Sequence, residues 1–362
     1  MNKTRTTMYD VAKAAGVSGP AVSVVLNNRT ESTIKVSAET RERILQAARD
    51  LNYTPSILGR GLAERKSFVI GLLLSEINSH FVADVIRGVQ DIATEQRYSP
   101  VVYIHGGPGE ETTEFERCLD RQVDGLIVDT FDLPADRTNV ERYCDLAKSG
   151  FPVVELFGTS IPDVPRVNVD FQGDGRCAAE YLIKQGHQRI ALVIHDQYQR
   201  RQIHWAAWGF YSGYQAAMTE AGLEPIIITA PAIVTSPSAL AFVESGRRAA
   251  QSLAAQADKP TAAICYSNRR AFGLFQGLRD AGLNVPDDMS VVGYYEREIA
   301  ELTNPPLTSL VVASRRAGQM AAETVFSILE GNTGVTASVA SDWITGGTVL
   351  PISSMTHNAG YH

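Results

Sequence analysis

The spacing of apolar residues divides the chain into two parts of different character. In residues 1–54 the apolar positions recur every three or four residues in three short segments, as in helices that bury one face. From residue 67 onward, apolar runs typical of buried parallel strands alternate with helical segments. The sequence therefore predicts an all-α head over residues 1–54, a linker over residues 55–66 and an α/β core over residues 67–362.

The head has clear signals for the start and the end of its first helix. Thr7 can cap this helix, while the Asp10 carboxylate bonds back to the backbone N–H of the cap, as in a capping box. Gly16 supplies the turn that follows. The residues predicted to be buried are Val11, Ala12 and Ala15.

Two further helices complete the predicted head. Ser18 caps the second helix, which tolerates Pro20 in its first turn, and a third helix covers residues 37–51. Two short helices joined by a glycine turn and supported by a third place the second helix in the major groove of DNA. On this pattern alone, DNA binding and a small structural helical cap remain equal alternatives. The predicted inner faces contain Ala21, Val22, Val25, Leu26, Ile44, Leu45, Ala48 and Leu51.

The core alternates strands with helices over most of its length. The predicted strands are residues 68–74, 101–104, 125–128, 152–156, 190–194, 262–266 and 290–294. The predicted helices between them include residues 82–89, 173–185, 213–220 and 270–281. This order predicts two doubly wound α/β units, in which ligands bind at the carboxyl ends of the strands.

The charge distribution distinguishes the head from the core. Residues 1–66 contain 11 Lys and Arg against 6 Asp and Glu, a net charge of +5, whereas the whole chain carries −7 and the remainder therefore −12. A basic head on an acidic core indicates that only the head approaches a polyanion. No apolar run is long enough for a membrane span, and the N-terminus lacks the pattern of a signal peptide. With four dispersed cysteines, these features predict a cytoplasmic protein with reduced thiols and no membrane partner.

No group of residues has the spacing of a catalytic or metal site. There is no GxSxG element and no cysteine pair with metal-ligand spacing. We therefore expect no enzyme activity, no cofactor and no metal. The histidines that also lack metal-ligand spacing are His80, His105, His187, His195 and His204.

Several motifs in one order resemble the lactose/galactose-repressor (LacI/GalR) family. The head motifs include Tyr9-Asp10-Val11-Ala12, Ala15-Gly16-Val17-Ser18, Val22-Ser23 and Leu51-Asn52-Tyr53. The core motifs include Gly186-His187-Gln188-Arg189, Val285-Pro286-Asp287-Asp288 and Pro305-Pro306-Leu307-Thr308. The resemblance implies a transcription regulator, expected to be a repressor, that binds a near-palindromic operator as a homodimer and responds to a small-molecule effector.

The same resemblance implies a periplasmic-binding-protein-like core in which the chain crosses between two subdomains near residues 168, 300 and 335. Residues 67–168 and 301–335 would form the N-subdomain, and residues 169–300 and 336–362 the C-subdomain. The helix at residues 315–329 would return to the N-subdomain.

The head departs from the family at the positions that contact bases. The family uses the two residues after the capping serine and one residue after the second serine, which here are Gly19, Pro20 and Val24. None of them can form the bidentate hydrogen bonds that distinguish base pairs, although Val24 can touch a thymine methyl. The DNA contacts predicted from the resemblance are Thr7, Tyr9, Ser18, Gly19, Pro20, Ala21, Ser23, Val24, Asn27, Arg29, Lys35, Tyr53, Ser56, Gly59 and Leu62.

The linker and the loop at residues 28–35 add two further expectations. Leu62 holds the position of the leucine that the family wedges into the minor groove. Gly59 and Gly61 disfavour the helix that the family forms there on DNA, so the linker should be ordered only on the operator; alternatively, it is a plain flexible linker. The loop is longer than is usual in the family, and Arg29 and Lys35 either extend the phosphate contacts or remain solvated.

The resemblance also predicts effector-contacting residues, which lie at the ends of strands and in an aromatic segment at residues 204–211. The family's usual Arg is replaced by Phe210 and its usual Asp by Tyr295, which argues against a simple free sugar. We expect a carbohydrate, glycoside or nucleoside-like effector held by ring stacking; alternatively, the aromatic segment fills the core. The predicted effector contacts are Phe81, Asp129, Asp170, Trp205, Trp208, Phe210, Asn268 and Tyr295.

Two other classes of function were weighed against a transcription regulator. A solute-binding protein of a transport system would share the core fold, but the attached basic head argues against it. An enzyme on the same scaffold would need a catalytic site that the sequence does not contain. The sequence therefore favours an effector-controlled regulator of transcription.

Overall fold

The computed structural model contains two compact units, the head Met1–Phe68 and the core Val69–His362. Predictions for Asn27, Arg29, Ser56, Gly59 and Leu62 lie outside the residues that it describes. The described residues are 6–26, 34–53, 61, 64–75, 80–105, 108–120, 122–130, 137–158, 161–199, 205–230 and 239–355.

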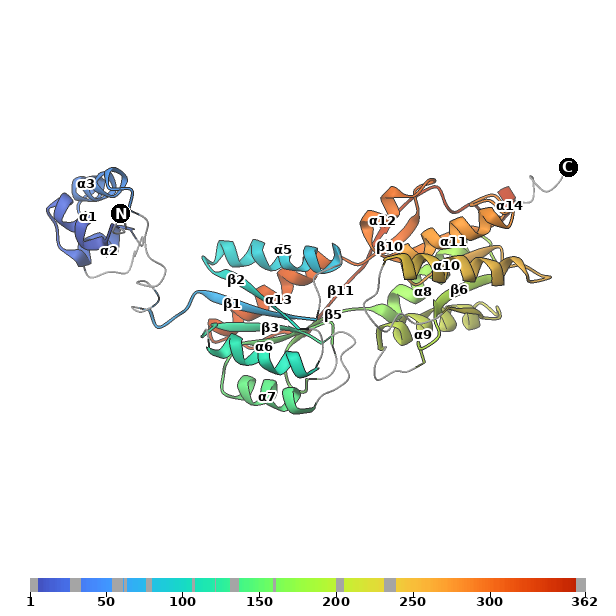
Figure 1. Cartoon of the computed structure of the whole chain (residues 1–362), viewed down its shortest axis with the longest axis horizontal. Coiled ribbons are helices and arrows are strands. Elements are labelled where there is room, and N and C mark those ends of the chain that lie inside the picture. Colours follow the sequence, from blue (N-terminus) through green and yellow to red (C-terminus); the bar gives the residue numbers. More distant parts are fainter. Residues whose placement is uncertain are drawn as a thin grey trace. The chain divides into compact units, whose positions relative to one another are not determined.

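The head is a bundle of helices α1 (Met8–Ala15), α2 (Gly19–Leu26) and α3 (Ala38–Asp50), as predicted (Figure 1). The capping box is confirmed, because the Thr7 hydroxyl accepts from the Asp10 N–H at 3.3 Å and the Asp10 carboxylate accepts from the Thr7 N–H at 2.8 Å. The buried cluster is formed by Val11, Ala12, Ala15, Val22, Val25, Ile44, Ala47 and Ala48.

The head core differs from its prediction at several positions. Ala47 is buried although it was not predicted, whereas Leu26, Leu45 and Leu51 are only partly buried and pack against the cluster. Ala21 is half-buried and does not belong to the cluster. In such short helices the angular position of a residue near the edge of the apolar face depends on how the helices pack, which spacing alone does not determine.

The first half of the core is a six-stranded parallel sheet in the order β11-β5-β4-β3-β1-β2. Its central strands are buried apolar runs, as expected for a parallel sheet covered on both faces. Its strands are β1 (Val69–Leu74), β2 (Ser99–Ile104), β3 (Gly125–Asp129), β4 (Val153–Leu156), β5 (Arg166–Val169) and β11 (Ala337–Val339).

Helices α5 (His80–Glu95) and α13 (Ser314–Leu329) lie together on one face of this sheet, and α6 (Pro108–Asp120) and α7 (Arg137–Lys148) cover the other (Figure 1). A β-carbon on Gly88 would lie 2.0 Å from the carbonyl oxygen of Arg315, so only glycine permits this approach of α5 to α13.

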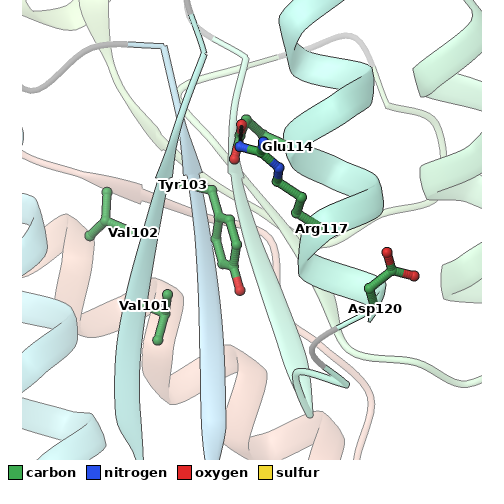
Figure 2. Close-up of a pocket in the computed structure, with 6 residues that line it drawn as sticks. All are labelled: Val101, Val102, Tyr103, Glu114, Arg117 and Asp120. Carbon is green, nitrogen blue, oxygen red and sulfur yellow. Dashed lines mark hydrogen bonds and ion pairs between the residues drawn. The ribbon is translucent and has the colours of Figure 1, made fainter.

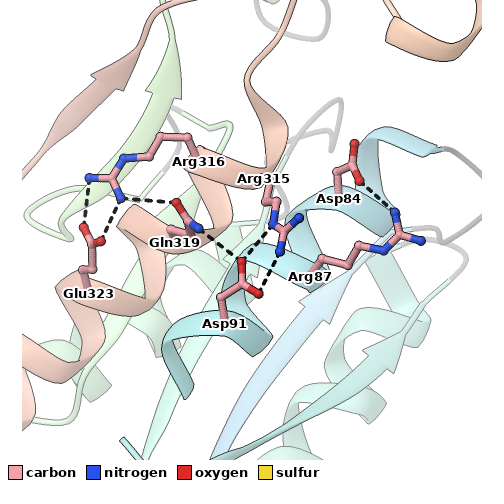
Figure 3. Close-up of polar contacts among 7 residues, drawn as sticks. All are labelled: Asp84, Arg87, Asp91, Arg315, Arg316, Gln319 and Glu323. Atoms are coloured by element: carbon pink, nitrogen blue, oxygen red, sulfur yellow. Dashed lines mark hydrogen bonds and ion pairs between the residues drawn. The ribbon is translucent and has the colours of Figure 1, made fainter. Parts of the chain in front are cut away.

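An ion pair joins the same two helices at their exposed edge. Both carboxylate oxygens of Asp91 on α5 accept from the Arg315 guanidinium, at 2.8 and 3.0 Å, and one also accepts from Gln319 at 3.1 Å (Figure 3). These hydrogen bonds, chiefly those from Arg315, hold the pKa of Asp91 below its usual value. Helix α13 thus returns to the first half of the core, as the sequence predicted for residues 315–329.

The second half of the core repeats the architecture with a sheet in the order β12-β10-β9-β8-β6-β7, in which only β12 is antiparallel to its neighbour among the described strands. Helices α8 and α9 pack together, as do α10 and α11. The strands are β6 (Ile190–His195), β7 (Ile226–Ala230), β8 (Ala262–Cys265), β9 (Ser290–Tyr295), β10 (Thr308–Val311) and β12 (Asp342–Ile344). The helices are α8 (Phe171–Lys184), α9 (Trp205–Glu220), α10 (Ala239–Ala254), α11 (Asn268–Asp280), α12 (Arg297–Leu302) and α14 (Ile352–Met355).

The chain passes between the two sheets three times, and two of the expected crossing points shift. The first crossing lies between β5 and α8, near residue 168 as expected. The second lies between β10 and α13, because the strand at Thr308–Val311 pairs with β9 of the second sheet and not with the first sheet. The third lies between β11 and β12, because Ala337–Val339 pairs with β5 of the first sheet. The expected crossings near residues 300 and 335 are thus corrected to about 312 and 340.

Candidate nucleic-acid interface and effector site

Helix α2 exposes only short side chains. Val22 and Val25 are buried, so the opposite side of the helix forms its surface. On that surface Pro20 is exposed, and Ser23 and Val24 are half-buried. Gly19 and Ala21 are half-buried, and Ser18 is exposed just before the helix.

The remaining described DNA candidates surround α2 without forming one uniform surface. Tyr9 is 76% exposed on α1, and Lys35 is exposed before α3. Thr7 is exposed, but its hydroxyl already donates to the Asp10 carboxylate at 2.6 Å in the capping box. Tyr53 packs partly against the head core, so its ring contributes to the fold of the head.

The expected effector residues Phe81 and Tyr295 are in contact, although they belong to different halves of the core. Their rings are stacked with centroids 4.7 Å apart and an interplanar angle of 23°. Phe81 lies in the first turn of α5, and Tyr295 ends β9. Phe157, directly after β4, also packs against Phe81, with ring centroids 4.8 Å apart. Three aromatic rings from the carboxyl ends of both sheets therefore form one cluster.

The cluster continues into the second half of the core through Tyr294, which is completely buried. Its ring lies 5.8 Å from that of Tyr295, 4.5 Å from that of Phe210 and 5.6 Å from that of Tyr266. Phe171, at the start of α8, connects Tyr294 to Trp205. The sequence segment at residues 204–211 therefore contributes to this aromatic cluster.

The three aromatic residues predicted in that segment have different surroundings. Phe210 has no exposed surface. At this position the aromatic ring therefore fills the core, which was the alternative to effector contact. Trp205 and Trp208 are half-buried, and Trp208 packs against Tyr211 at 5.4 Å. The predicted helix at residues 213–220 in fact begins at Trp205, so both tryptophans lie on the first turns of α9.

A buried carboxylate lies where the chain makes its third crossing. Asp174 on α8 accepts hydrogen bonds from the Tyr294 hydroxyl and from the Ser341 hydroxyl, both at 2.7 Å. Ser341 lies between β11 and β12. Burial raises the pKa of Asp174 above its usual value, and the two hydrogen bonds oppose that rise. The carboxylate thus ties α8 and β9 to the crossing segment.

Asn268 was predicted as an effector contact, but its amide is used within the protein. It has no exposed surface, and its side-chain nitrogen donates to the Glu296 carbonyl at 2.6 Å and to the Ser309 hydroxyl at 2.9 Å. The Glu296 carboxylate in turn accepts from the Asn268 N–H at 2.9 Å. Burial raises the pKa of Glu296, and the nearby Arg269 guanidinium opposes this. These contacts hold the start of α11 against β9 and β10.

The two aspartates predicted at the site also have hydrogen-bond partners within the chain. Asp129 ends β3 and is 6% exposed, and its carboxylate accepts from the Ser75 hydroxyl at 3.2 Å. Asp170 is exposed at the first crossing, where it caps α8 by accepting from the Gly173 N–H at 2.8 Å. Asp170 therefore has a structural role that the sequence alone did not indicate.

Two surface depressions lie away from these residues. One, of about 550 Å³, lies between β2 and α6 and is lined by Val101, Val102, Tyr103, Glu114, Arg117 and Asp120 (Figure 2). The other, of about 300 Å³, lies beside α11 and includes Phe272, Phe275 and Leu283. Neither contains a predicted effector contact. Among the described residues there is no cluster of His, Cys, Asp and Glu that could hold a metal ion, and no helix both long and apolar enough to cross a membrane.

Sequence reasoning missed several members of the aromatic and polar cluster. All of them except Asp174, which lies within the first turn of α8, share a detectable signal, because they lie at or just after the carboxyl end of a strand, where α/β sheets bind ligands. An apolar strand followed directly by an aromatic or acidic residue would have identified most of them. The residues missed are Phe157, Phe171, Asp174, Tyr266, Tyr294 and Glu296.

Comparison with protein families gives two matches, one within the head and one within the core. Residues 7–56 match the bacterial regulatory proteins of the lacI family, and residues 179–349 match the periplasmic binding protein-like domain. The HTH-type transcriptional repressor PurR of Vibrio campbellii is 32% identical over 319 residues, which cover 88% of this chain and 90% of the relative. Catabolite control protein A of Priestia megaterium is 31% identical over 307 residues, covering 84% and 87%.

Solved structures agree with these matches. The lac repressor dimer bound to operator and the anti-inducer ONPF has a TM-score of 0.76 at 25% identity, covering 96% of this chain and all of that one. The complex of the transcriptional regulator CelR with cellobiose has a TM-score of 0.64 at 25% identity, covering 95% of this chain and 100% of that chain. The chain therefore belongs to the lacI family of bacterial regulatory proteins and is a DNA-binding transcription regulator controlled by a small-molecule effector.

Proposed function

We propose that this regulator is a homodimeric repressor of a near-palindromic operator, and that its effector carries a flat ring held between the two halves of the core. The proposal about the effector is supported by the stack of Phe81 on Tyr295, which joins the carboxyl ends of both sheets. Aromatic faces of this kind bind sugar and nucleobase rings, and nearby polar groups fix their orientation.

The residues that replace the family's polar pair narrow the class of effector. Phe210 and Tyr295 cannot form the charged hydrogen bonds that suit neighbouring sugar hydroxyls. The related structure of CelR holds cellobiose, and the relatives include a ribose operon repressor and the repressor PurR. We therefore propose a glycoside or a nucleoside-like effector, with Phe81, Tyr295 and Trp205 as ring contacts and Asp129 as a polar contact.

Control of DNA binding would follow from linkage between two sites. An effector that binds one arrangement of the two α/β halves more tightly shifts the population toward that arrangement. Because three segments connect the halves, a change in their arrangement reaches α13 and α5 of the first half. In a dimer, such a change would alter the spacing of the two heads and with it the affinity for the operator.

A thermal-shift screen of the full-length protein tests the effector class. Nucleosides, aromatic glycosides, disaccharides and simple monosaccharides are compared at equal concentration. A ligand at 100 times its Kd adds about 2.7 kcal/mol to the unfolding free energy of the form it binds. We expect stabilisation by a ligand with an aromatic or extended ring system. Stabilisation by monosaccharides alone would contradict the proposed class.

Three further parts of the proposal need separate measurements. Sedimentation of the full-length protein should give the mass of a dimer, and operators selected from random DNA should contain two inverted half-sites. We propose that the regulator acts in the cytoplasm. We also propose that it releases its effector chemically unchanged, so the effector recovered after long incubation should be intact. A modified effector would instead indicate an enzyme.

A further inference from the structure

The recognition helix α2 lacks the side chains that normally discriminate base pairs. Its sequence, Gly19 to Leu26, reads GPAVSVVL, in which Ser23 alone carries a polar side chain. Helices in the major groove usually distinguish bases through Arg, Lys, Asn or Gln, whose long side chains form paired hydrogen bonds to base edges. Helix α2 therefore needs another means of recognition if it contributes to the choice of operator.

Burial fixes which face of α2 can meet DNA. Val22 and Val25 belong to the head core and have exposed fractions of 0% and 3%. Pro20 is exposed and Val24 half-buried, and these two residues lie one turn apart on the same side of the helix. The surface available to the major groove therefore consists mainly of C–H groups.

Gly19 gives a second, independent observation. A β-carbon built on Gly19 would meet no atom within 4 Å, and the residue has an ordinary helical backbone. Neither packing within the head nor backbone conformation requires glycine, although glycine is a poor helix former. A missing side chain at the N-terminal end of a recognition helix instead allows close approach to a partner. Short side chains such as those of Pro20 and Val24 need such close approach to reach base edges.

One group in the major groove matches this surface. The C5 methyl of thymine is the apolar group that a base pair presents there, and apolar side chains contact it. We propose that α2 recognises its operator half-sites by packing Pro20 and Val24 against thymine methyls, with Gly19 permitting the close approach. This proposal rests on α2 lying in the major groove, and it names the chemical group that the helix recognises.

The test removes the methyl groups one at a time. An operator is first selected from random duplex DNA with the full-length protein, and each thymine of a half-site is then replaced by deoxyuridine, which lacks only the C5 methyl. Loss of a buried methyl contact should weaken binding about fourfold. We expect this loss at one or two thymines of each half-site and none at thymines outside the half-sites. If deoxyuridine has no effect at any thymine of the half-sites, the proposal is wrong.

A variant of the protein assigns the contact to the helix. In Val24→Ala the deoxyuridine effect at one thymine should shrink from about fourfold to little or none, because the methyl no longer has a partner. Thymines contacted by Pro20 serve as the internal control and should keep their effect. An unchanged deoxyuridine effect at every thymine in both Val24→Ala and Pro20→Ala would place methyl recognition elsewhere and contradict the proposal.

Gly19 has its own test, with two measurements. Gly19→Leu should not lower the thermal stability of the head, because the position is open and leucine is the better helix former, while binding to the selected operator weakens about tenfold or more. Wild-type affinity in Gly19→Leu would overturn the close-approach argument. If the wild-type protein selects no operator over random DNA, the repressor function fails and this proposal fails with it. If an operator is selected but deoxyuridine has no effect in its half-sites, only the proposal of methyl recognition fails.

Discussion

The rings of Phe81 and Tyr295 stack with centroids 4.7 Å apart, although Phe81 begins helix α5 of the first half of the core and Tyr295 ends β9 of the second, more than half the chain away. Tyr295 has a φ of +95°, a backbone conformation that non-glycine residues rarely adopt. An unfavourable backbone conformation persists where surrounding contacts hold it, and such positions gather at ligand sites. The stack therefore links the two halves of the core, and a flat ligand bound there would contact both of them.

Replacing Tyr295 should lower the affinity for the effector more than it lowers the stability of the fold. In Tyr295→Ala we expect about tenfold lower effector affinity, since an aromatic pair contributes about 0.5–1.5 kcal/mol beyond its buried area. Affinity for the operator without effector should be unchanged. Calorimetric titration and DNA binding measure the two quantities. Tyr181→Ala is the matched control, because it removes another aromatic pair, with Trp343 at 4.5 Å, outside the proposed site. Equal loss in both variants would contradict a ligand-binding role for Tyr295.

Asp174 makes the stability of the core depend on pH. Its pKa is raised above 3.8 in the folded protein, chiefly by burial. A carboxyl group with a raised pKa stabilises the fold most below its usual pKa, and this contribution is lost as the pH rises through the folded-state value. Relative to Asp174→Asn, the wild type should therefore lose stability as the pH increases from about 4 toward neutrality. Urea unfolding of both proteins across this range measures the difference, and a difference that stays constant or changes in the opposite direction would exclude this role for Asp174.

Gly88 should be intolerant of even the smallest side chain. Its β-carbon would lie 2.0 Å from the Arg315 carbonyl oxygen, so Gly88→Ala must separate α5 from α13. We expect a loss of about 1–3 kcal/mol or more in unfolding free energy, measured by denaturant unfolding of the core. Gly209→Ala on α9 is the control, because the nearest atoms to its new methyl, the Phe171 β-carbon at 3.3 Å and the Gln172 backbone nitrogen at 3.5 Å, need to move by only a few tenths of an ångström. Similar stability of Gly88→Ala and wild type would contradict the close helix contact.

The capping box of α1 should control DNA binding without affecting the effector site. Thr7→Ala removes the side chain that accepts from Asp10 and should cost the head about 1 kcal/mol. Operator affinity should fall, whereas effector binding by the core, a separate compact unit, should not change. Thr7→Ser keeps the hydroxyl and should behave like the wild type. A drop in effector affinity in Thr7→Ala would show that the two units are not independent.

The elements predicted correctly are those specified by neighbouring residues. The capping box of Thr7 with Asp10 and the left-handed turn at Gly16 depend on a few adjacent positions, so the sequence shows them directly. The second crossing was wrong for a different reason. The strand at Thr308–Val311 is short and reads TSLV, which does not favour either sheet, and only its pairing with β9 decides between them. Such pairing is long-range and leaves no local pattern.

The same distinction applies to the candidate site. Phe81 and Tyr295 were predicted one by one from their positions, but the cluster that joins them to Phe157 and Tyr294 exists only once both sheets are placed. Asn268 was expected to face the effector because it matches a position where the family often has a polar ligand-binding residue. Its hydrogen bonds to Glu296 and Ser309, which no spacing in the sequence indicates, use its amide for the fold instead.

The three passages of the chain between the sheets determine how this protein can be divided. No single cut in the core leaves both sheets complete, because the first sheet takes its last strand from Ala337–Val339 and the second takes its last strand from Asp342–Ile344. The core must therefore be inherited or transplanted whole. The head ends at Phe68 and has its own buried cluster. Exchange of DNA specificity between regulators of this architecture is consequently possible at one junction, while exchange of effector specificity has to proceed by substitutions within an undivided core.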